Sequence, residues 1–184
     1  MTYKIIGDSC LDLTEELKKD PKFQMVPLTL QVGTAQVVDD ETFDQKAFIR
    51  MVKECPECPK TACPSPEIFK EAYEAADAEA VFVITLSSHL SGSYNSAALA
   101  KQLYEEEMKE KGITSSKKIE VLDSESASAG QLEQALYIRD LCEQGLNFEE
   151  VVEKLRKFRD EMHTYFVLAV SYTHLRAHET SAHL

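Results

Sequence analysis

The sequence predicts an α/β fold in which a mainly parallel sheet is covered by helices. Short apolar runs typical of buried strands alternate along the chain with segments whose apolar residues recur at helical spacing. The chain has 184 residues, of which 43% are hydrophobic, and this is enough for one domain with a substantial core. In such sheets ligands bind at the carboxyl ends of strands, so we expect a site in the turns after Leu86 and Leu122.

The first part of the chain contains three expected strands and two helix starts. Asp12 and Glu15 have the spacing of a capping box, which predicts a short helix running to about Lys19. Thr42 and Gln45 repeat that spacing ahead of apolar residues at helical intervals. The strands are expected at Tyr3–Gly7, at Met25–Val32 and at Thr34–Val38, the last two joined through Gly33.

The rest of the chain continues the alternation of helices and strands. Ser65, Pro66 and Glu67 mark a helix start with a cap, a proline and an acidic first turn. A compact apolar strand at Val81–Leu86 runs into a loop of small hydroxyl residues, which is followed by a long helix. The further expected elements are a strand at Lys118–Leu122, a helix ending at Gly145, a helix capped by Asn147 and a last strand at Thr164–Val170.

The charge balance argues against several classes of partner. The chain has 32 acidic and 20 basic side chains and a formal net charge of -12. Nucleic acids and anionic membrane surfaces require basic faces, so neither is an expected partner. No apolar run approaches the roughly 20 residues of a membrane-spanning helix, and the first residues lack the apolar core of a signal peptide. We therefore expect a cytoplasmic protein without integral membrane association.

The stretch Ser87–Ser96 holds the strongest indication of a binding site. Small hydroxyl residues fill it, between a buried strand and a long helix. Ser91 is expected to be the helix N-cap, and the N–H groups of Gly92 and Ser93 would form an anion site together with the helix dipole. Simple helix capping would use the same residues. A weaker candidate is Thr61, whose hydroxyl stands in a turn ahead of another capped helix.

Five motifs occur in a fixed order along the first 130 residues. They are Asp8-Ser9-Cys10-Leu11-Asp12-Leu13, Val26-Pro27-Leu28, residues 60–66 (Lys-Thr-Ala-Cys-Pro-Ser-Pro), residues 87–97 (Ser-Ser-His-Leu-Ser-Gly-Ser-Tyr-Asn-Ser-Ala), and Val121-Leu122-Asp123-Ser124 followed by Ser128-Ala129-Gly130. Together they resemble the motifs of the DegV family of bacterial fatty-acid-binding proteins, and the resemblance continues to about Leu168. The family has a hydroxyl residue where Ala62 stands, glutamine in place of Cys63 and threonine in place of Ser93.

The resemblance implies that residues 1–170 are the lipid-binding N-terminal lobe of a longer protein whose second lobe is truncated here. In the family one long-chain fatty acid lies between two lobes, and by position its carboxylate would meet Thr61 and Ser91, with Gly92 and Ser93 completing the loop. Family members act as carriers that present the fatty acid to a separate fatty acid kinase, so the resemblance implies no catalytic residue, metal or cofactor.

Residues 171–184 do not continue the pattern of strands and helices. They hold three of the five histidines and carry no net charge. We expect this segment to be a non-native-looking, disordered tail. His174 and His178 lie four residues apart and could share a metal on one helix face.

Other interpretations lead to different classes of protein. A phosphotransferase or hydrolase would use the Ser91 loop as an anion cradle, although the common phosphate-loop, dinucleotide and nucleophile motifs are absent. Cys55, Cys58 and Cys63 could bind zinc, could include a redox pair, or could lie in a plain loop. The odd number of five cysteines argues against a disulfide framework.

Three more residues have both a functional and a structural interpretation. His89 could be a general base or a solvent-facing loop residue. Asp8 and Asp123 each end a strand near the expected site, where the pair could bind magnesium or each could cap a turn.

Overall fold

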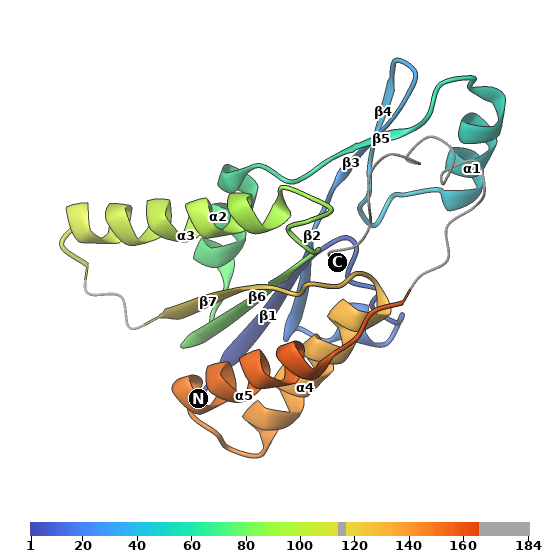
Figure 1. Ribbon diagram of the computed structural model, residues 1–184. Coiled ribbons are helices and arrows are strands. Elements are labelled where there is room, and N and C mark those ends of the chain that lie inside the picture. Colours follow the sequence, from blue (N-terminus) through green and yellow to red (C-terminus); the bar gives the residue numbers. More distant parts are fainter. Residues whose placement is uncertain (114–116, 166–184) are drawn as a thin grey trace.

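A parallel sheet of four strands lies at the centre of the fold. A computed structural model describes residues 1–113 and 117–165 of the chain. The sheet order is β2 (Phe23–Val26), β1 (Tyr3–Asp8), β6 (Ala80–Thr85) and β7 (Lys118–Asp123), and each neighbouring pair is parallel (Figure 1). The strands predicted for β1, β6 and β7 are confirmed to within one residue at each end.

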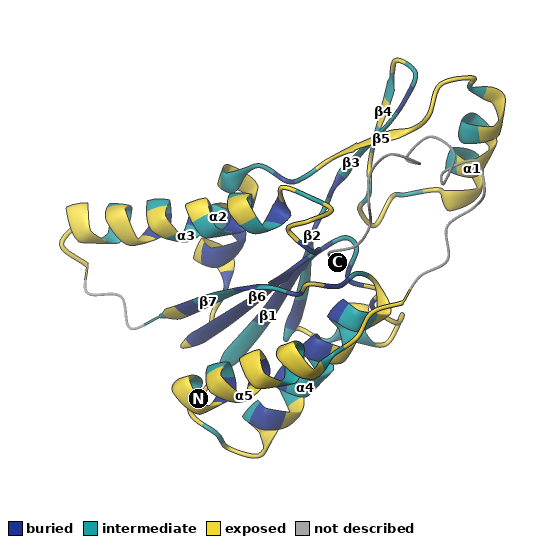
Figure 2. Ribbon diagram, in the orientation of Figure 1, coloured by how far each residue is buried: buried dark blue, intermediate teal, exposed yellow. Residues whose placement is uncertain are grey.

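Two helices cover each face of this sheet, and each pair has its own core. The helices α4 (Ala129–Glu143) and α5 (Phe148–Glu161) lie on one face, and α2 (Pro66–Ala75) and α3 (Ser93–Glu110) lie on the other. Successive strand residues point to opposite faces. Ile5 therefore packs under α4 and α5, whereas Ile6 packs under α2 and α3. Figure 2 shows these buried strands between helices with exposed outer sides, which confirms the predicted fold class.

A second, antiparallel sheet follows directly after β2. The prediction of one strand at Met25–Val32 was wrong, because β2 ends at Val26 and β3 (Thr29–Val32) belongs to the other sheet, whose order is β4 (Ala35–Val38), β3 and β5 (Lys60–Ala62). Pro27 lies at the break, since proline has no N–H to donate to a sheet. The predicted pairing of β3 and β4 through Gly33 is confirmed, and Gly33 has a φ of 57° there.

Local capping decides where the helices begin. The predicted cap of α5 is confirmed, because Asn147 and Glu150 exchange hydrogen bonds as a capping box. The cap predicted at Thr42 was wrong. The helix α1 (Gln45–Glu54) is capped by Asp44, whose carboxylate accepts a hydrogen bond from the Ala47 N–H at 2.9 Å.

The helix predicted after Asp12 forms only as a single 3₁₀ turn, η1 (Leu17–Lys19). The Asp12 carboxylate does not cap it, because it accepts a hydrogen bond from the Ser128 hydroxyl at 3.1 Å. The N-cap position is Glu16, whose side chain makes no capping hydrogen bond, and the Leu17 N–H donates to the Thr14 hydroxyl at 3.3 Å. Asp12, on which the prediction depended, is engaged with a tertiary partner instead.

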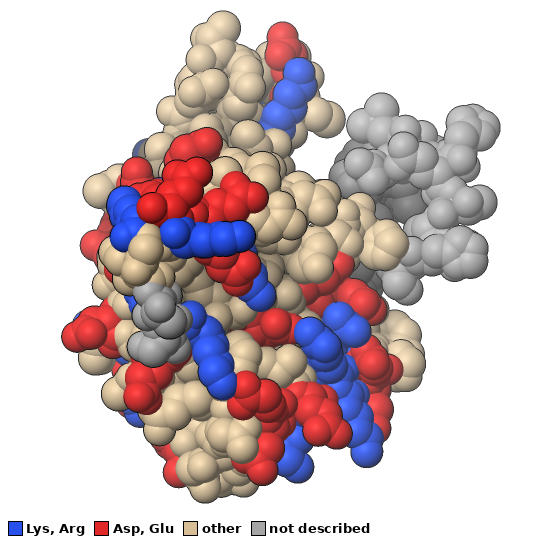
Figure 3. All heavy atoms as spheres, turned by 90° about the vertical axis from the view of Figure 1, so that its left-hand side faces the viewer, with Lys and Arg blue, Asp and Glu red and all other residues tan. Residues whose placement is uncertain are grey.

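Charges of both signs share the outer surface. Figure 3 shows basic and acidic side chains interspersed over one face of the molecule. Lys70 of α2 pairs with Glu74 at 2.8 Å and also with Glu107 of α3. Lys118 of β7 pairs with Glu149 of α5 at 2.5 Å. The face in Figure 3 is therefore not the single-sign basic surface that a nucleic acid requires.

Some predictions concern residues that the structure does not describe. Thr164 and Tyr165, the first residues of the last predicted strand, have no regular secondary structure, and the other residues of that strand lie outside the described part. The predicted tail at 171–184, with His174 and His178, also lies outside it. Between residues 1 and 165, leaving out 114–116, no helix is long and apolar enough to cross a membrane.

Candidate functional site

The polar loops of the chain meet at the carboxyl-terminal edge of the parallel sheet. From β1 the chain passes to β2 on one side, whereas β6 lies on the other side of β1. The chain therefore extends the sheet in one direction from β1 to β2 and in the opposite direction from β6 to β7, so the gap between β1 and β6 is a topological switch point. Ligands of open α/β sheets bind at the carboxyl ends of the strands at such a point. Asp8 ends β1, and the hydroxyl loop, residues 87–93, follows β6. The turns after Leu86 and Leu122 lie side by side at this edge, as their strands are paired.

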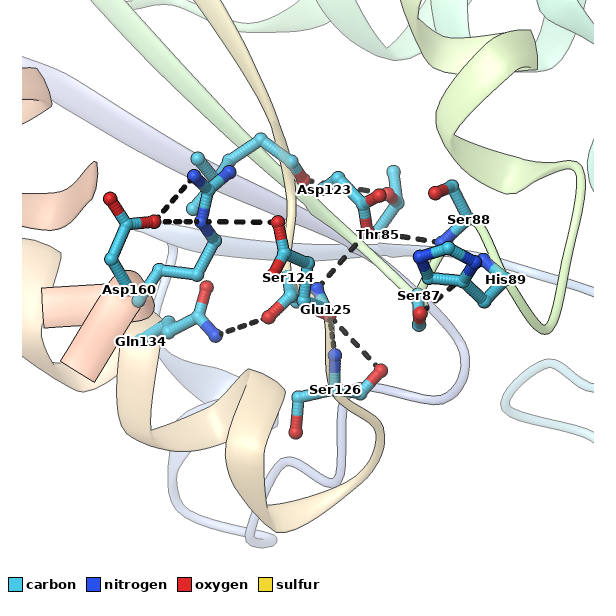
Figure 4. Close-up of polar contacts among 12 residues, drawn as sticks. Thr85, Ser87, Ser88, His89, Asp123, Ser124, Glu125, Ser126, Gln134 and Asp160 are labelled. Carbon is cyan, nitrogen blue, oxygen red and sulfur yellow. Dashed lines mark hydrogen bonds and ion pairs between the residues drawn. The ribbon is translucent and has the colours of Figure 1, made fainter. Parts of the chain in front are cut away.

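The hydroxyl loop is folded back on itself and bonded to the loop after β7. Ser87 is buried, and its carbonyl oxygen accepts a hydrogen bond from the Ser91 N–H at 3.0 Å. The Ser87 N–H donates to the Ser126 carbonyl at 2.9 Å, and the Ser88 N–H donates to the Asp123 carboxylate at 3.0 Å (Figure 4). These protein contacts fix the backbone of the loop.

Ser91 is not the helix N-cap that the sequence predicts. The helix α3 begins at Ser93, its N-cap is Gly92, and no side chain caps it. The Ser91 hydroxyl instead accepts a hydrogen bond from the Ser93 N–H at 3.2 Å and lies 3.1 Å from the Ser93 hydroxyl. This is a hydroxyl turn between residues two apart, which shifts the cap by one residue. The Ser93 N–H, one of the two expected for an anion, is therefore already engaged inside the protein.

Asp8 is a buried carboxylate on which several loops converge. It accepts hydrogen bonds from the Leu86 N–H at 2.7 Å, from the Gln131 side-chain amide at 3.1 Å and from the Cys10 N–H at 3.2 Å. Burial raises the pKa of Asp8, and these hydrogen bonds, together with the nearby Ser93 side chain, act in the opposite direction. Asp8 thereby joins the end of β1, the loop after β6 and the first turn of α4.

The loop between β7 and α4 has an uncommon backbone conformation. Glu125 and Ser128 have φ angles of 51° and 50°, in the region that residues other than glycine seldom occupy. Gly130 follows at the start of α4, where a Cβ would lie 1.9 Å from the Ser126 Oγ. The backbone of α4 thus approaches the loop more closely than any other residue type would allow.

Two buried glutamines of α4 belong to this site, and the sequence analysis missed them. Gln131 donates to Asp8, and Gln134 donates to the Ser124 carbonyl at 2.9 Å (Figure 4). Residues three apart lie on the same face of a helix. The available signal was two glutamines at that spacing on a face that otherwise carries Ala135, Ile138 and Leu141.

Thr61 approaches the site by way of Cys63. Thr61 is exposed on β5, an edge strand of the antiparallel sheet, and pairs with Leu30. Two residues further on, the Cys63 Sγ lies 3.8 Å from the Ser96 Oγ, and a Cβ on Gly92 would lie 3.0 Å from that sulfur. The segment that carries Thr61 therefore contacts the start of α3, although no hydrogen bond joins Thr61 to the hydroxyl loop.

The zinc alternative finds no assembled site in the described part of the chain. Cys55 and Cys63 are free and half-buried, and Cys58 is free and exposed. Among residues 1–113 and 117–165, no group of three or more histidine, cysteine, aspartate or glutamate side chains could hold a metal ion.

Asp123 and His89 have structural roles in the loops. The Asp123 carboxylate accepts hydrogen bonds from the N–H groups of Ser88 and Glu125, at 3.0 and 3.1 Å. Asp8 and Asp123 therefore cap turns, which was the second interpretation of this pair. His89 is exposed, and its backbone N–H donates to the Ser87 hydroxyl at 3.4 Å (Figure 4). Its exposure agrees with a solvent-facing loop residue.

Comparisons with known proteins link this geometry to one family. Residues 2–177 match the family described as "uncharacterised protein, DegV family". A DegV domain-containing protein of Streptococcus pneumoniae is 38% identical over 172 residues, which are 92% of this chain and 58% of that protein. The chain thus spans less than two thirds of the length of this relative.

Solved structures of similar proteins contain fatty acids. A DegV family protein from Ruminococcus gnavus, refined with vaccenic acid, is 43% identical with a TM-score of 0.87, over 96% of this chain and 61% of that one. The Fatty Acid Kinase (Fak) B3 protein of Streptococcus pneumoniae, loaded with linoleic acid, is 37% identical with a TM-score of 0.74, over 87% of this chain and 55% of that one.

Proposed function

Because this chain belongs to the DegV family, we propose that it is the fatty-acid-binding lobe of a cytoplasmic carrier. The carrier holds a long-chain fatty acid by its carboxylate and presents it to a separate fatty acid kinase. The observation that carries the proposal is the hydroxyl loop at the switch point of the sheet, with the Thr61 segment in contact with it through Cys63. Thr61 and Ser91 are the proposed head-group contacts, and Gly92 supplies the close backbone approach.

The energetics suit a carrier whose ligand has a long apolar tail. A fatty acid of about 16 carbons buries about 14 methylenes, and at ~0.8 kcal/mol each this is roughly 11 kcal/mol of transfer free energy. A carboxylate at the start of a helix adds ~1–2 kcal/mol. The tail therefore sets the affinity, and the hydroxyl loop sets the orientation in which the carboxylate is presented.

The kinase part of the proposal depends on one relative, the protein named Fatty Acid Kinase (Fak) B3. The alternative function is a phosphotransferase or hydrolase that uses the Ser91 loop as an anion cradle. That cradle would need the N–H groups of Gly92 and Ser93, and the Ser93 N–H already donates to the Ser91 hydroxyl at 3.2 Å.

Replacement of the two proposed head-group contacts tests the proposal. Ser91→Ala should weaken fatty-acid binding by a factor of about ten, which is the scale of one hydrogen bond to a charged group. Thr61→Val should have a similar effect. The double variant should lose less than the sum of the two free energies, because both hydroxyls would contact one carboxylate. Displacement of a fluorescent fatty acid measures each affinity.

Ser88→Ala is the matched control for the loop. Ser88 is exposed, and its contact with Asp123 uses the backbone N–H, which alanine keeps. Its affinity should equal that of the unchanged chain. If Ser91→Ala and Thr61→Val also bind like the unchanged chain, the head group does not lie between these residues.

A further inference from the structure

Three hydrogen bonds join the end of α5 to Ser91, the proposed head-group contact. The Oγ1 of Thr164, which follows α5 and its C-cap, lies 2.7 Å from the Ser126 Oγ. The Ser126 carbonyl oxygen accepts a hydrogen bond from the Ser87 N–H at 2.9 Å, and the Ser87 carbonyl oxygen accepts from the Ser91 N–H at 3.0 Å. The bonds therefore form one continuous path from the end of α5 to the hydroxyl loop.

Ser126 is the junction of this path, and its own loop holds it on both sides. Its N–H donates to the Ser124 Oγ at 3.1 Å, and the Ser124 hydroxyl donates to the Ser126 carbonyl at 3.1 Å. Ser126 is buried, and a buried hydroxyl that loses its partner costs free energy. The bond between Ser126 and Thr164 therefore holds the two segments together.

Two further contacts tie the end of α5 to the same part of the chain. The Arg159 Nε lies 3.6 Å from a carboxylate oxygen of Glu125. The Cε of Met162, the C-cap of α5, lies 3.5 Å from the position that a Cβ on Gly130 would occupy. Figure 4 shows the loop between β7 and α4 lying between α5 and the hydroxyl loop. The end of α5 is thus fastened to this loop at three points.

We infer that Ser126 and Thr164 are positioning residues that set the place of the hydroxyl loop, and with it of Ser91, relative to the end of α5. This inference deepens the proposed function and rests on it, because Ser91 is a proposed head-group contact. The residues after Thr164 lead toward the second lobe of the proposed carrier. The path would therefore join that lobe to the head-group site.

Removal of the Thr164 hydroxyl should loosen the hydroxyl loop. Thr164→Val keeps the shape of the side chain and loses the hydroxyl, whereas Thr164→Ser keeps the hydroxyl. We expect the Ser87 amide to exchange its hydrogen about two- to tenfold faster in Thr164→Val than in the unchanged chain, the scale of one hydrogen bond between neutral groups. Thr164→Ser should restore the slow exchange. A general loss of stability would also accelerate exchange in β1, where we expect no change.

The affinity for decanoate should follow the exchange rate. In NMR titrations of the 184-residue chain, Thr164→Val should bind about two- to tenfold more weakly than the unchanged chain, and Thr164→Ser should bind like it. Ser126→Ala should act like Thr164→Val, and the double variant should lose no more than Ser126→Ala alone, because both changes remove the same bond. His163→Ala is the control, since His163 is the exposed neighbour of Thr164.

Ser91→Ala separates failure of this inference from failure of the proposed function. If Ser91→Ala weakens binding of decanoate, the head-group contact stands. An unchanged exchange rate at Ser87 in Thr164→Val, or an unchanged affinity, then overturns the inference alone. If Ser91→Ala binds decanoate like the unchanged chain, the proposed head-group contact fails, and the inference that rests on it fails as well.

Discussion

Gly130 shows how a single residue can be fixed by its tertiary neighbours. It lies in the first turn of α4, where alanine would ordinarily favour the helix by ~1 kcal/mol. A Cβ at this position would lie 1.9 Å from the Ser126 Oγ and 2.9 Å from the Ser126 Cβ. We therefore expect Gly130→Ala to destabilise the chain by about 1–3 kcal/mol, the cost of overpacking, measured by urea unfolding.

A second substitution identifies the cause of the effect at Gly130. Ser126→Ala removes the oxygen of the closest contact, so the cost of Gly130→Ala should be smaller in that background than in the unchanged chain. If Gly130→Ala were as stable as the unchanged chain, or more so, helix propensity would dominate and the close contact would not matter.

Glu107 carries the clearest pH dependence at the scale of one residue. Hydrogen bonds from Lys111 and Lys70 lower the pKa of Glu107 to about 2. A carboxyl whose pKa is lower in the folded chain stabilises it above its ordinary pKa of 4.5, and this stabilisation is lost as the pH falls toward 2. Because Glu107 and its two lysine partners remain partly open to solvent, Glu107→Gln should lower the melting temperature at pH 7 by only about a degree or two.

Melting curves across the acid range check this prediction. The difference between the unchanged chain and Glu107→Gln should shrink between pH 4.5 and pH 2. Glu106→Gln is the control, since Glu106 is exposed on the same helix and forms no ion pair with any described residue. A difference that stays constant with pH would mean that the effect of Glu107 does not come from its charge.

At the scale of elements, we expect the segment between α1 and β5 to be a plain loop that only connects the two elements. It carries Cys55 and Cys58, which are free and lie outside any cluster of metal-binding side chains in the described residues. Cys55→Ser combined with Cys58→Ser should therefore leave the melting temperature and fatty-acid binding unchanged. Stoichiometric zinc in the unchanged chain, lost in the double variant together with several degrees of melting temperature, would contradict this expectation.

At the scale of the whole molecule, the chain covers 58% of a curated relative's length. We expect the chain by itself to retain fatty acid weakly and to associate with itself. If about half of the contact with the tail is missing, about 5 kcal/mol is lost, which corresponds to several thousandfold in affinity. Exposed apolar side chains such as Leu90 in the hydroxyl loop and Leu99 on α3 favour association.

Size-exclusion chromatography and lipid extraction of the purified chain test this expectation together. Association with little bound lipid would agree with a site completed by a second lobe. A monomer that carries one fatty acid per chain would instead show that this lobe is a complete binding module, and the proposed two-lobe site would be wrong.

The sequence by itself determined the features that arise from contacts close along the chain. Hydrophobic periodicity predicted the alternation of strands and helices, because burial of one face of an element needs apolar residues at its own repeat. The capping box of Asn147 and the turn at Gly33 were predicted because they depend on residues two or three apart. The motif residues that indicated the family, and the edge of the sheet where they lie, were also available at this level.

The tertiary structure decided which residues meet. The Asp8 carboxylate binds the Leu86 N–H, 78 residues away, and the Gln131 amide, 123 residues away. No local pattern encodes such pairs, because they depend on how the strands are ordered in the sheet. For the same reason only the structure could divide the chain at Pro27 between two sheets and place Cys63 against Gly92. A buried polar group must find its partner wherever the packed chain provides one.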